Sequence, residues 1–217
     1  MRAVIYTGGE LFAERVAERP AEGDLVIAAD AGLRAAQAFG VRPQILLGDF
    51  DSLGQPPDPP PAAELLRVPA EKDETDTQLA VSLALSRGAT EILIIGGFGG
   101  RLDHTLANLS LLENLARRGV PAVATNGAAR ARFLAGGEAV IPRDVRFRYL
   151  SLISADRRAV GVTVSGCKYP LANATLRRDN AGFGTSNEIT SPRAVVSVRR
   201  GGLWILECRD LLFSREK

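Results

Sequence analysis

The chain has 217 residues, of which 46% are hydrophobic and 24% charged, a composition typical of a globular protein with a sizeable core. The formal net charge of +2 argues against a general nucleic-acid or membrane-surface binder, and no apolar run approaches the roughly 20 residues that span a bilayer. The charge is unevenly divided: residues 1–120 carry 11 basic and 17 acidic side chains, and residues 121–217 carry 16 and 8.

The first half alternates short apolar runs with helical segments, which predicts a mostly parallel sheet covered on both faces. Asp30 is the expected N-cap of the first helix, and Thr75 with Asp76 supplies the start signal of the second. Strands are predicted at Ala3–Tyr6, Leu25–Ala29, Gln44–Leu47, Leu65–Val68, Glu91–Ile95 and Ala122–Thr125, and helices at Ala31–Phe39, Gln78–Ser86 and Leu102–Arg118.

The second half changes its period near Asn126-Gly127-Ala128 and shows no long helical pattern. Its short β-rich runs are separated by Gly, Pro or Asn, which is typical of an antiparallel sandwich or small barrel. We therefore predict a Rossmann-like α/β domain over residues 1–127 and an all-β C-terminal sandwich over residues 128–217. The runs are Arg130–Leu134, Ala139–Ile141, Arg146–Ile153, Val160–Val164, Ala174–Leu176, Ala194–Arg199 and Leu203–Glu207.

Aspartates follow several predicted strands of the first half, and seven of the twelve in the chain lie between positions 30 and 103. Ligands of open parallel sheets bind at the carboxyl ends of the strands, so these side chains are expected at one edge. Clustered carboxylates need a cation, and Mg²⁺ is the expected one because it combines carboxylates with waters and substrate phosphates. The predicted metal ligands are Asp49, Asp51, Asp73 and Asp76.

A glycine-rich segment, Gly96-Gly97-Phe98-Gly99-Gly100, follows a predicted strand and opens a predicted helix. Backbone N–H groups at such a position can bind phosphate, and the guanidinium of Arg101 can add a two-point contact. The segment matches neither the dinucleotide fingerprint nor a Walker loop. His104 either acts as a base or packs beside the nucleotide. A site for a nucleoside triphosphate with Mg²⁺ is expected, and it suits phosphoryl or diphosphoryl transfer.

The sequence resembles the thiamin pyrophosphokinase family in six segments, which occur in the same order along the chain as in the family. One departure is Gln78, where an acid is expected. The resemblance implies an enzyme, a homodimeric transferase that moves diphosphate from ATP to the hydroxyl of thiamine and releases AMP. The matching segments are Ala29-Asp30-Ala31-Gly32, Gly48–Ser52, Lys72–Asp76, Gly99–His104 with Leu106-Ala107-Asn108, Gly166–Leu171 and Ser186-Asn187-Glu188.

The resemblance also implies roles for single residues. In the α/β ATP- and Mg²⁺-binding domain, Arg101 would hold the transferred phosphates. Our own hypothesis is that Asp76, at the start of a predicted helix beside the metal ligands, receives the hydroxyl proton or orients the alcohol. Asp49 and Asp51 complete the catalytic set. In the β-sandwich, the thiamine-binding and dimerisation domain, Tyr169 would stack on the pyrimidine ring while Ser186 and Asn187 line the pocket. The implied ATP-binding residues are Asp30, Gly97, Gly100, Arg101, Asp103 and His104.

Two other functions remain open from the residues alone. The first is a related diphosphokinase that acts on another heterocyclic alcohol, such as a hydroxymethyl pterin. The second is a non-catalytic nucleotide-binding module, which the aspartate cluster disfavours. Two cysteines make no disulfide framework, and the N-terminus reads as a strand and not as a signal peptide, so we expect a cytoplasmic protein without nucleic-acid or membrane partners.

Overall fold

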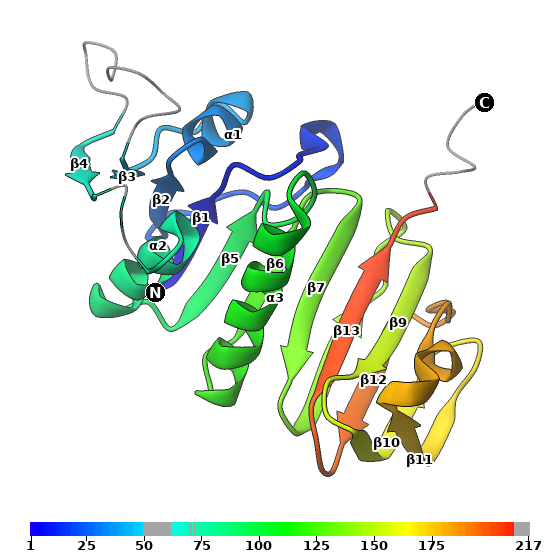
Figure 1. Cartoon of the computed structure of the whole chain (residues 1–217). Coiled ribbons are helices and arrows are strands. Elements are labelled where there is room, and N and C mark those ends of the chain that lie inside the picture. The colour runs from blue at the N-terminus through cyan, green and yellow to red at the C-terminus, as the bar shows by residue number, and fades with distance from the viewer. Residues whose placement is uncertain (50–61, 70, 72, 211–217) are drawn as a thin grey trace. The chain divides into compact units, whose positions relative to one another are not determined.

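A computed structural model describes residues 1–49, 62–69, 71 and 73–210 of the chain (Figure 1). The chain divides into two compact units, Met1–Gly127 and Ala128–Lys217. The first unit alternates strands with helices and the second is built from antiparallel strands, as predicted. None of the helices in the described ranges is long and apolar enough to cross a membrane.

The described strands of the first unit form a parallel sheet in the order β4-β3-β2-β1-β5-β6. The order reverses between β1 and β5, which creates the switch point at which such sheets bind ligands. It differs from the 3-2-1-4-5-6 order of dinucleotide-binding folds, so the similarity to them is one of architecture only. The strands are β1 (Arg2–Tyr6), β2 (Leu25–Ala29), β3 (Ile45–Gly48), β4 (Glu64–Arg67), β5 (Glu91–Ile95) and β6 (Ala122–Thr125).

Helices cover this sheet because its strands are apolar on both faces. On one face, Ala35 and Ala36 of α1 join a buried cluster with Val4 and Tyr6 of β1. The helices α2 and α3 contact one another and lie in front of the sheet in Figure 1. The first unit contains η1 (Ala13–Arg15), α1 (Gly32–Ala38), α2 (Asp76–Ser86) and α3 (Leu102–Arg117).

The predicted helix starts have different outcomes. Thr75 caps α2 as expected, since its hydroxyl accepts a hydrogen bond from the Gln78 N–H at 3.2 Å. The prediction that Asp30 caps α1 is wrong, because Ala31 precedes this helix and provides no side-chain cap. Asp30 instead has a positive φ of 46°, and its N–H donates to the carbonyl of Leu47 at 2.7 Å. The sharp turn from β2 into α1 beside β3 imposes this conformation.

The second unit consists of antiparallel strands whose described pairings form two groups, β7-β13-β9 and β11-β10-β12-β8. A short 3₁₀ segment, η2 (Arg178–Gly184), follows β11. The strands are β7 (Ala129–Leu134), β8 (Gly137–Pro142), β9 (Tyr149–Ser154), β10 (Arg158–Ser165), β11 (Leu171–Arg177), β12 (Arg193–Val198) and β13 (Leu203–Cys208).

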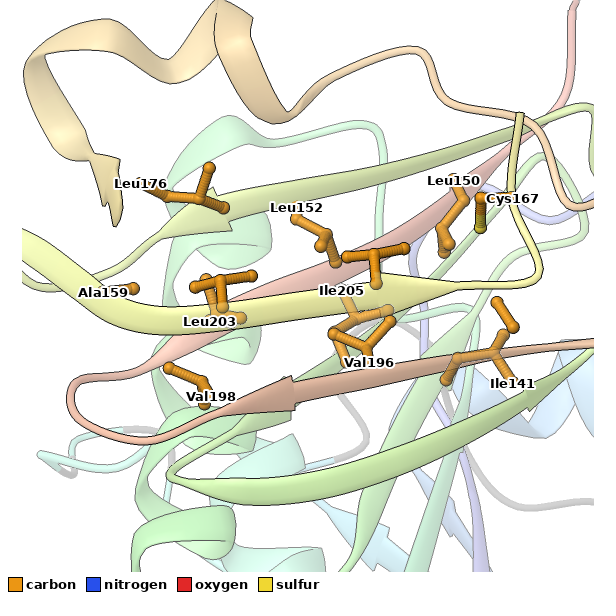
Figure 2. Close-up of a cluster of buried hydrophobic side chains, with 13 residues drawn as sticks. Ile141, Leu150, Leu152, Ala159, Cys167, Leu176, Val196, Val198, Leu203 and Ile205 are labelled. Atoms are coloured by element: carbon orange, nitrogen blue, oxygen red, sulfur yellow. The ribbon is translucent and has the colours of Figure 1, made fainter. Parts of the chain in front are cut away.

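One apolar cluster joins the two groups of strands (Figure 2). Leu152 of β9 and Ile205 of β13 come from the first group, and Ile141 of β8 and Val196 of β12 come from the second. Alternate residues of each strand point into this cluster, as the period of two requires. On β8, Ile141 is fully buried while its neighbour Val140 is 47% exposed.

This alternation predicts a large difference between two neighbouring substitutions. Ile141→Ala should lower the free energy of unfolding by about 2–5 kcal/mol, because it leaves a cavity in the core. Val140→Ala should lower it by roughly 0.5 kcal/mol or less, since that side chain faces solvent. The fluorescence of Trp204, the single tryptophan, reports urea unfolding of this unit. Equal effects of both substitutions would contradict the packing.

Candidate active site

A cavity of about 810 Å³ opens at the carboxyl ends of the strands of the first unit. Its walls come from the segments that follow β1, β2, β3 and β5, from the first turn of α2 and from the first two turns of α3. The cavity therefore lies where the strand order reverses, as the switch-point rule requires. Its size suits a small-molecule ligand.

Most of the residues predicted for ATP and metal line this cavity. Asp73 and Asp103 do not line it, and Asp51 lies outside the described residues. The predicted residues in the wall are Asp30, Asp49, Asp76, Gly97, Gly100, Arg101 and His104.

The loops that follow β1 and β5 are packed directly on each other. The N–H of Thr7 donates to the carbonyl of Ile95 at 2.9 Å, and the Thr7 hydroxyl donates to the carbonyl of Gly96 at 2.6 Å. A Cβ atom at Gly9 would lie 2.1 Å from the same Gly96 oxygen. Only glycine therefore allows these two loops to approach each other this closely.

Arg101 stands at the edge of the cavity and is paired with Asp103. Its guanidinium donates two hydrogen bonds to this carboxylate, at 3.1 Å through Nε and 2.6 Å through Nη2. This pairing, together with the N–H of His104, lowers the pKa of Asp103 to about 2. Both side chains are largely exposed, so the guanidinium is accessible to an anion in the cavity.

Several cavity residues were missed by sequence analysis. Thr7, Gly8 and Gly9 follow β1, and the same strand-end rule that selected the aspartates would have found them. Thr105 and Asn108 lie on the face of α3 that carries Arg101 and His104, at spacings of three and four residues. The helical period was available in the sequence, but only the structure shows which face borders the cavity.

The residues predicted to bind thiamine lie together in the second unit. Asn187 holds Tyr169 through two hydrogen bonds: its Oδ1 accepts from the Tyr169 N–H at 3.0 Å, and its Nδ2 donates to the Tyr169 carbonyl at 2.8 Å. Ser186 has a positive φ of 61°, and its N–H donates to the hydroxyl of Ser151. The Tyr169 side chain is 58% exposed and thus accessible to a ligand ring.

The donor set of the cavity is compatible with Mg²⁺. Among the described residues, no group of three His, Cys, Asp or Glu side chains is arranged to hold a metal ion alone. Mg²⁺ commonly binds through one or two carboxylates and takes its other ligands from water and substrate phosphates. Asp49 and Asp76, which line the same cavity, can provide such a pair of carboxylates.

Comparisons with known proteins point to one family across both units. Residues 19–124 match the model of the thiamin pyrophosphokinase catalytic domain, and residues 138–203 match that of the thiamin pyrophosphokinase vitamin B1 binding domain. The chain is 32% identical over 192 residues to thiamine pyrophosphokinase of Bacillus subtilis, which covers 87% of this chain and 89% of that protein.

Solved structures agree with the sequence comparison. The fold is similar to that of a crystal structure of Bacillus subtilis thiamine pyrophosphokinase, with a TM-score of 0.86, 28% identity and coverage of 97% of this chain and 100% of the other. A thiamin pyrophosphokinase from Geobacillus thermodenitrificans matches with a TM-score of 0.81, 28% identity and coverage of 98% and 99%.

The pairing of Arg101 with Asp103 predicts a measurable change in titration. Arg101→Met should raise the pKa of Asp103 from about 2 toward its ordinary value, because the hydrogen bonds that favour the carboxylate are lost. Since the depressed pKa belongs to the folded state, the pairing favours folding at neutral pH, and this contribution disappears as the pH falls toward 2. Carboxyl ¹³C NMR measures the titration.

Asp179 provides the matched control, because Arg177 lowers its pKa through the same i, i+2 pairing. Its pKa should not change in the Arg101→Met variant. If Asp103 still titrated near pH 2 without Arg101, the assigned cause would be wrong.

Proposed function

This chain belongs to the thiamin pyrophosphokinase family, and from this premise we propose how its residues perform the reaction of the family. The chain is a thiamine diphosphokinase, a transferase that moves the diphosphate group of ATP to the hydroxyl of thiamine and releases AMP. The match of the second unit to a vitamin B1 binding domain carries this conclusion and disfavours a pterin substrate or a non-catalytic module.

We propose that ATP occupies the cavity of the first unit with its phosphates against the glycine-rich segment and the start of α3. Main-chain N–H groups of this segment and the helix N-terminus favour an anion. Arg101 supports the proposal, because its guanidinium borders the cavity and can leave Asp103 to bind phosphate oxygens in the same two-point fashion.

Mg²⁺ is the proposed cofactor, held by Asp49 and Asp76 together with the phosphates of ATP. When bound, it would neutralise charge on the transferring diphosphate. That Asp51 and Asp73 also bind the metal stays a prediction, because Asp51 lies outside the described residues and Asp73 does not line the cavity. Asp30 also borders the cavity and remains a candidate ATP contact.

The proposed reaction is an in-line displacement at the β-phosphorus of ATP. The hydroxyl oxygen of thiamine forms a bond to this phosphorus, the bond to the α,β-bridging oxygen breaks, and AMP leaves. The proton of the hydroxyl passes to the carboxylate of Asp76, which begins α2 at the cavity wall. Arg101 stabilises charge on the transferred phosphates, and much of the catalysis is positioning.

Thiamine is proposed to stack on Tyr169 and to hydrogen-bond with Ser186 and Asn187. The two hydrogen bonds between Asn187 and the main chain of Tyr169 support this assignment, since they hold an exposed aromatic ring beside polar groups. An aromatic face suits the flat pyrimidine of thiamine and a cationic ring next to it.

We further propose that the protein is a homodimer. Leu102 and Leu106 of α3 are 72% and 56% exposed, one turn apart on the same helix face and next to Arg101 at the cavity edge. A second copy that covers these leucines would also exclude water from the phosphates. A cytoplasmic location, supported by the free thiols of Cys167 and Cys208, is part of the same proposal.

The activity is tested by incubating the protein with ATP, Mg²⁺ and thiamine. We expect AMP and thiamine diphosphate in equal amounts, and no products after chelation of the metal. Release of ADP would instead indicate simple phosphoryl transfer, and the absence of nucleotide turnover would favour a binding module.

Asp76→Asn tests the proposed proton acceptor. The amide keeps the shape of the side chain but cannot accept a proton, so kcat should fall by about 10²- to 10⁴-fold. The fall should persist at saturating Mg²⁺, where a weakened metal ligand no longer limits turnover. Glu113→Gln, at an exposed ion pair with Arg117 elsewhere on the first unit, is the control and should retain normal turnover. Near-normal turnover of the Asp76 variant would remove Asp76 from this role.

Leu106→Glu tests the dimer. A buried, unpaired carboxylate at a subunit contact should shift the protein to the monomer in sedimentation experiments and reduce activity together with it. Leu65→Glu, at an exposed position on the edge strand β4, is the matched control. A wild-type protein that is monomeric at micromolar concentration, or a dimer unaffected by Leu106→Glu, would contradict the proposal.

A further inference from the structure

The glycine loop, residues 96–100, has N–H groups that find no acceptor within the described part of the chain. Among the described residues, the N–H groups of Gly97, Phe98 and Gly100 donate to no carbonyl or side chain. Gly96, Gly99 and Gly100 have positive φ values of 83°, 81° and 69°. Peptide planes rotate easily in a main chain this rich in glycine, so contacts with other residues are needed to fix their direction.

Two buried side chains hold carbonyls of this loop. The hydroxyl of Thr7, which is 3% exposed, donates to the carbonyl of Gly96 at 2.6 Å. The amide of Asn108, which is 8% exposed, donates from Nδ2 to the carbonyl of Gly97 at 2.9 Å. The residues come from two distant elements, since Thr7 follows β1 and Asn108 lies in the second turn of α3.

A trans peptide points its C=O and its N–H in opposite directions. The hydrogen bond from Thr7 to the Gly96 carbonyl therefore also fixes the N–H of Gly97. The hydrogen bond from Asn108 to the Gly97 carbonyl fixes the N–H of Phe98 in the same way. Neither of these two N–H groups has an acceptor among the described residues, and Gly97 belongs to the cavity wall.

Thr105 completes the arrangement from α3. Its hydroxyl accepts a hydrogen bond from the N–H of Gly99 at 3.2 Å. The same hydroxyl donates a hydrogen bond to the carbonyl of Arg101, also at 3.2 Å. This contact ties the far end of the loop to the residue that carries the guanidinium.

We propose that Thr7 and Asn108 are positioning residues for the phosphates of ATP. Their hydrogen bonds to the carbonyls of Gly96 and Gly97 hold the two peptides that flank Gly97, and so keep the N–H of Gly97, which lines the cavity, available to an anion. A reversed peptide would present a carbonyl oxygen to the phosphates and repel them. The inference rests on the proposed function, because it names residues that prepare the ATP site without touching the reacting atoms.

A merely structural role is the alternative, since a buried donor that loses its acceptor also destabilises the fold. The two roles differ in what they change. Loss of stability alone lowers the unfolding temperature and leaves the KM for each substrate intact. Loss of loop orientation raises the KM for ATP in folded protein and leaves the KM for thiamine unchanged.

The test uses pairs of variants of the full chain. Thr7→Val removes the hydroxyl at nearly constant shape, and Thr7→Ser keeps it. Asn108→Asp keeps the shape and removes the donor. Ser110→Ala, on an exposed turn of the same helix, is the control for a lost hydroxyl on α3. Circular dichroism first establishes that each variant is folded, and if Asn108→Asp does not fold, the Thr7 pair decides.

We expect Thr7→Val and Asn108→Asp to weaken the binding of Mg²⁺-ATP, measured by calorimetry without thiamine, by about tenfold, a typical effect of one hydrogen bond. Amide hydrogen exchange of residues 96–101 should increase in both variants. Thr7→Ser and Ser110→Ala should bind as the wild type does. Wild-type affinity and wild-type exchange in both Thr7→Val and Asn108→Asp would overturn the proposal.

These measurements separate this proposal from the proposed function. If the wild type binds ATP and the variants bind it more weakly, but no thiamine diphosphate forms, the positioning role stands and the assigned reaction fails. If thiamine diphosphate forms and both variants retain the wild-type KM for ATP, the reaction stands and the positioning role fails.

Discussion

The parallel pairing of β1 with β5 is the constraint on which the site depends. The two strands run in register from Arg2 beside Glu91 to Tyr6 beside Ile95, so their following loops leave the sheet at the same level. After β1 the chain continues toward β2 on one side, and after β5 it continues toward β6 on the other side. This divergence opens a crevice between the two loops. Gly9 and Thr7 pack against Gly96 between these loops, and all three residues line the cavity that we propose binds ATP.

The small net charge hides two opposite balances, and the second unit uses part of its basic excess internally. Arg130 and Arg132 of β7 both donate to Glu207 of β13, whose side chain is 3% exposed, and Arg130 also contacts Asp144. Burial opposes ionisation of Asp144, but its hydrogen bonds from Arg146 and Arg130 prevail and lower its pKa to about 2. These arginines join strands of the unit, so they need no polyanion to explain them.

Much of the fold was predictable because local periodicity and long-range packing agree. The strands at Leu25–Ala29 and Glu91–Ile95 are found where their apolar runs place them. The helix predicted at Gln78–Ser86 from the start signal of Thr75 and Asp76 is also found, and it begins at Asp76. Agreement fails where a tertiary requirement overrides a local preference. Asp30 is of a residue type that often caps helices, but the turn beside β3 gives it a positive φ, and Ala31 takes the N-cap position. Leu106 continues the helical repeat of α3 and is nevertheless 56% exposed.

The sequence by itself determined the two architectures, the aspartates and glycines at strand ends, and the family resemblance, because each of these depends on residue type and on short spacings along the chain. Only the tertiary structure decided which of these residues share a cavity and which buried partners orient them. Thr7 and Asn108 are separated by about a hundred residues and meet the glycine loop from different elements. Such contacts depend on strand order and helix rotation, which no local pattern encodes.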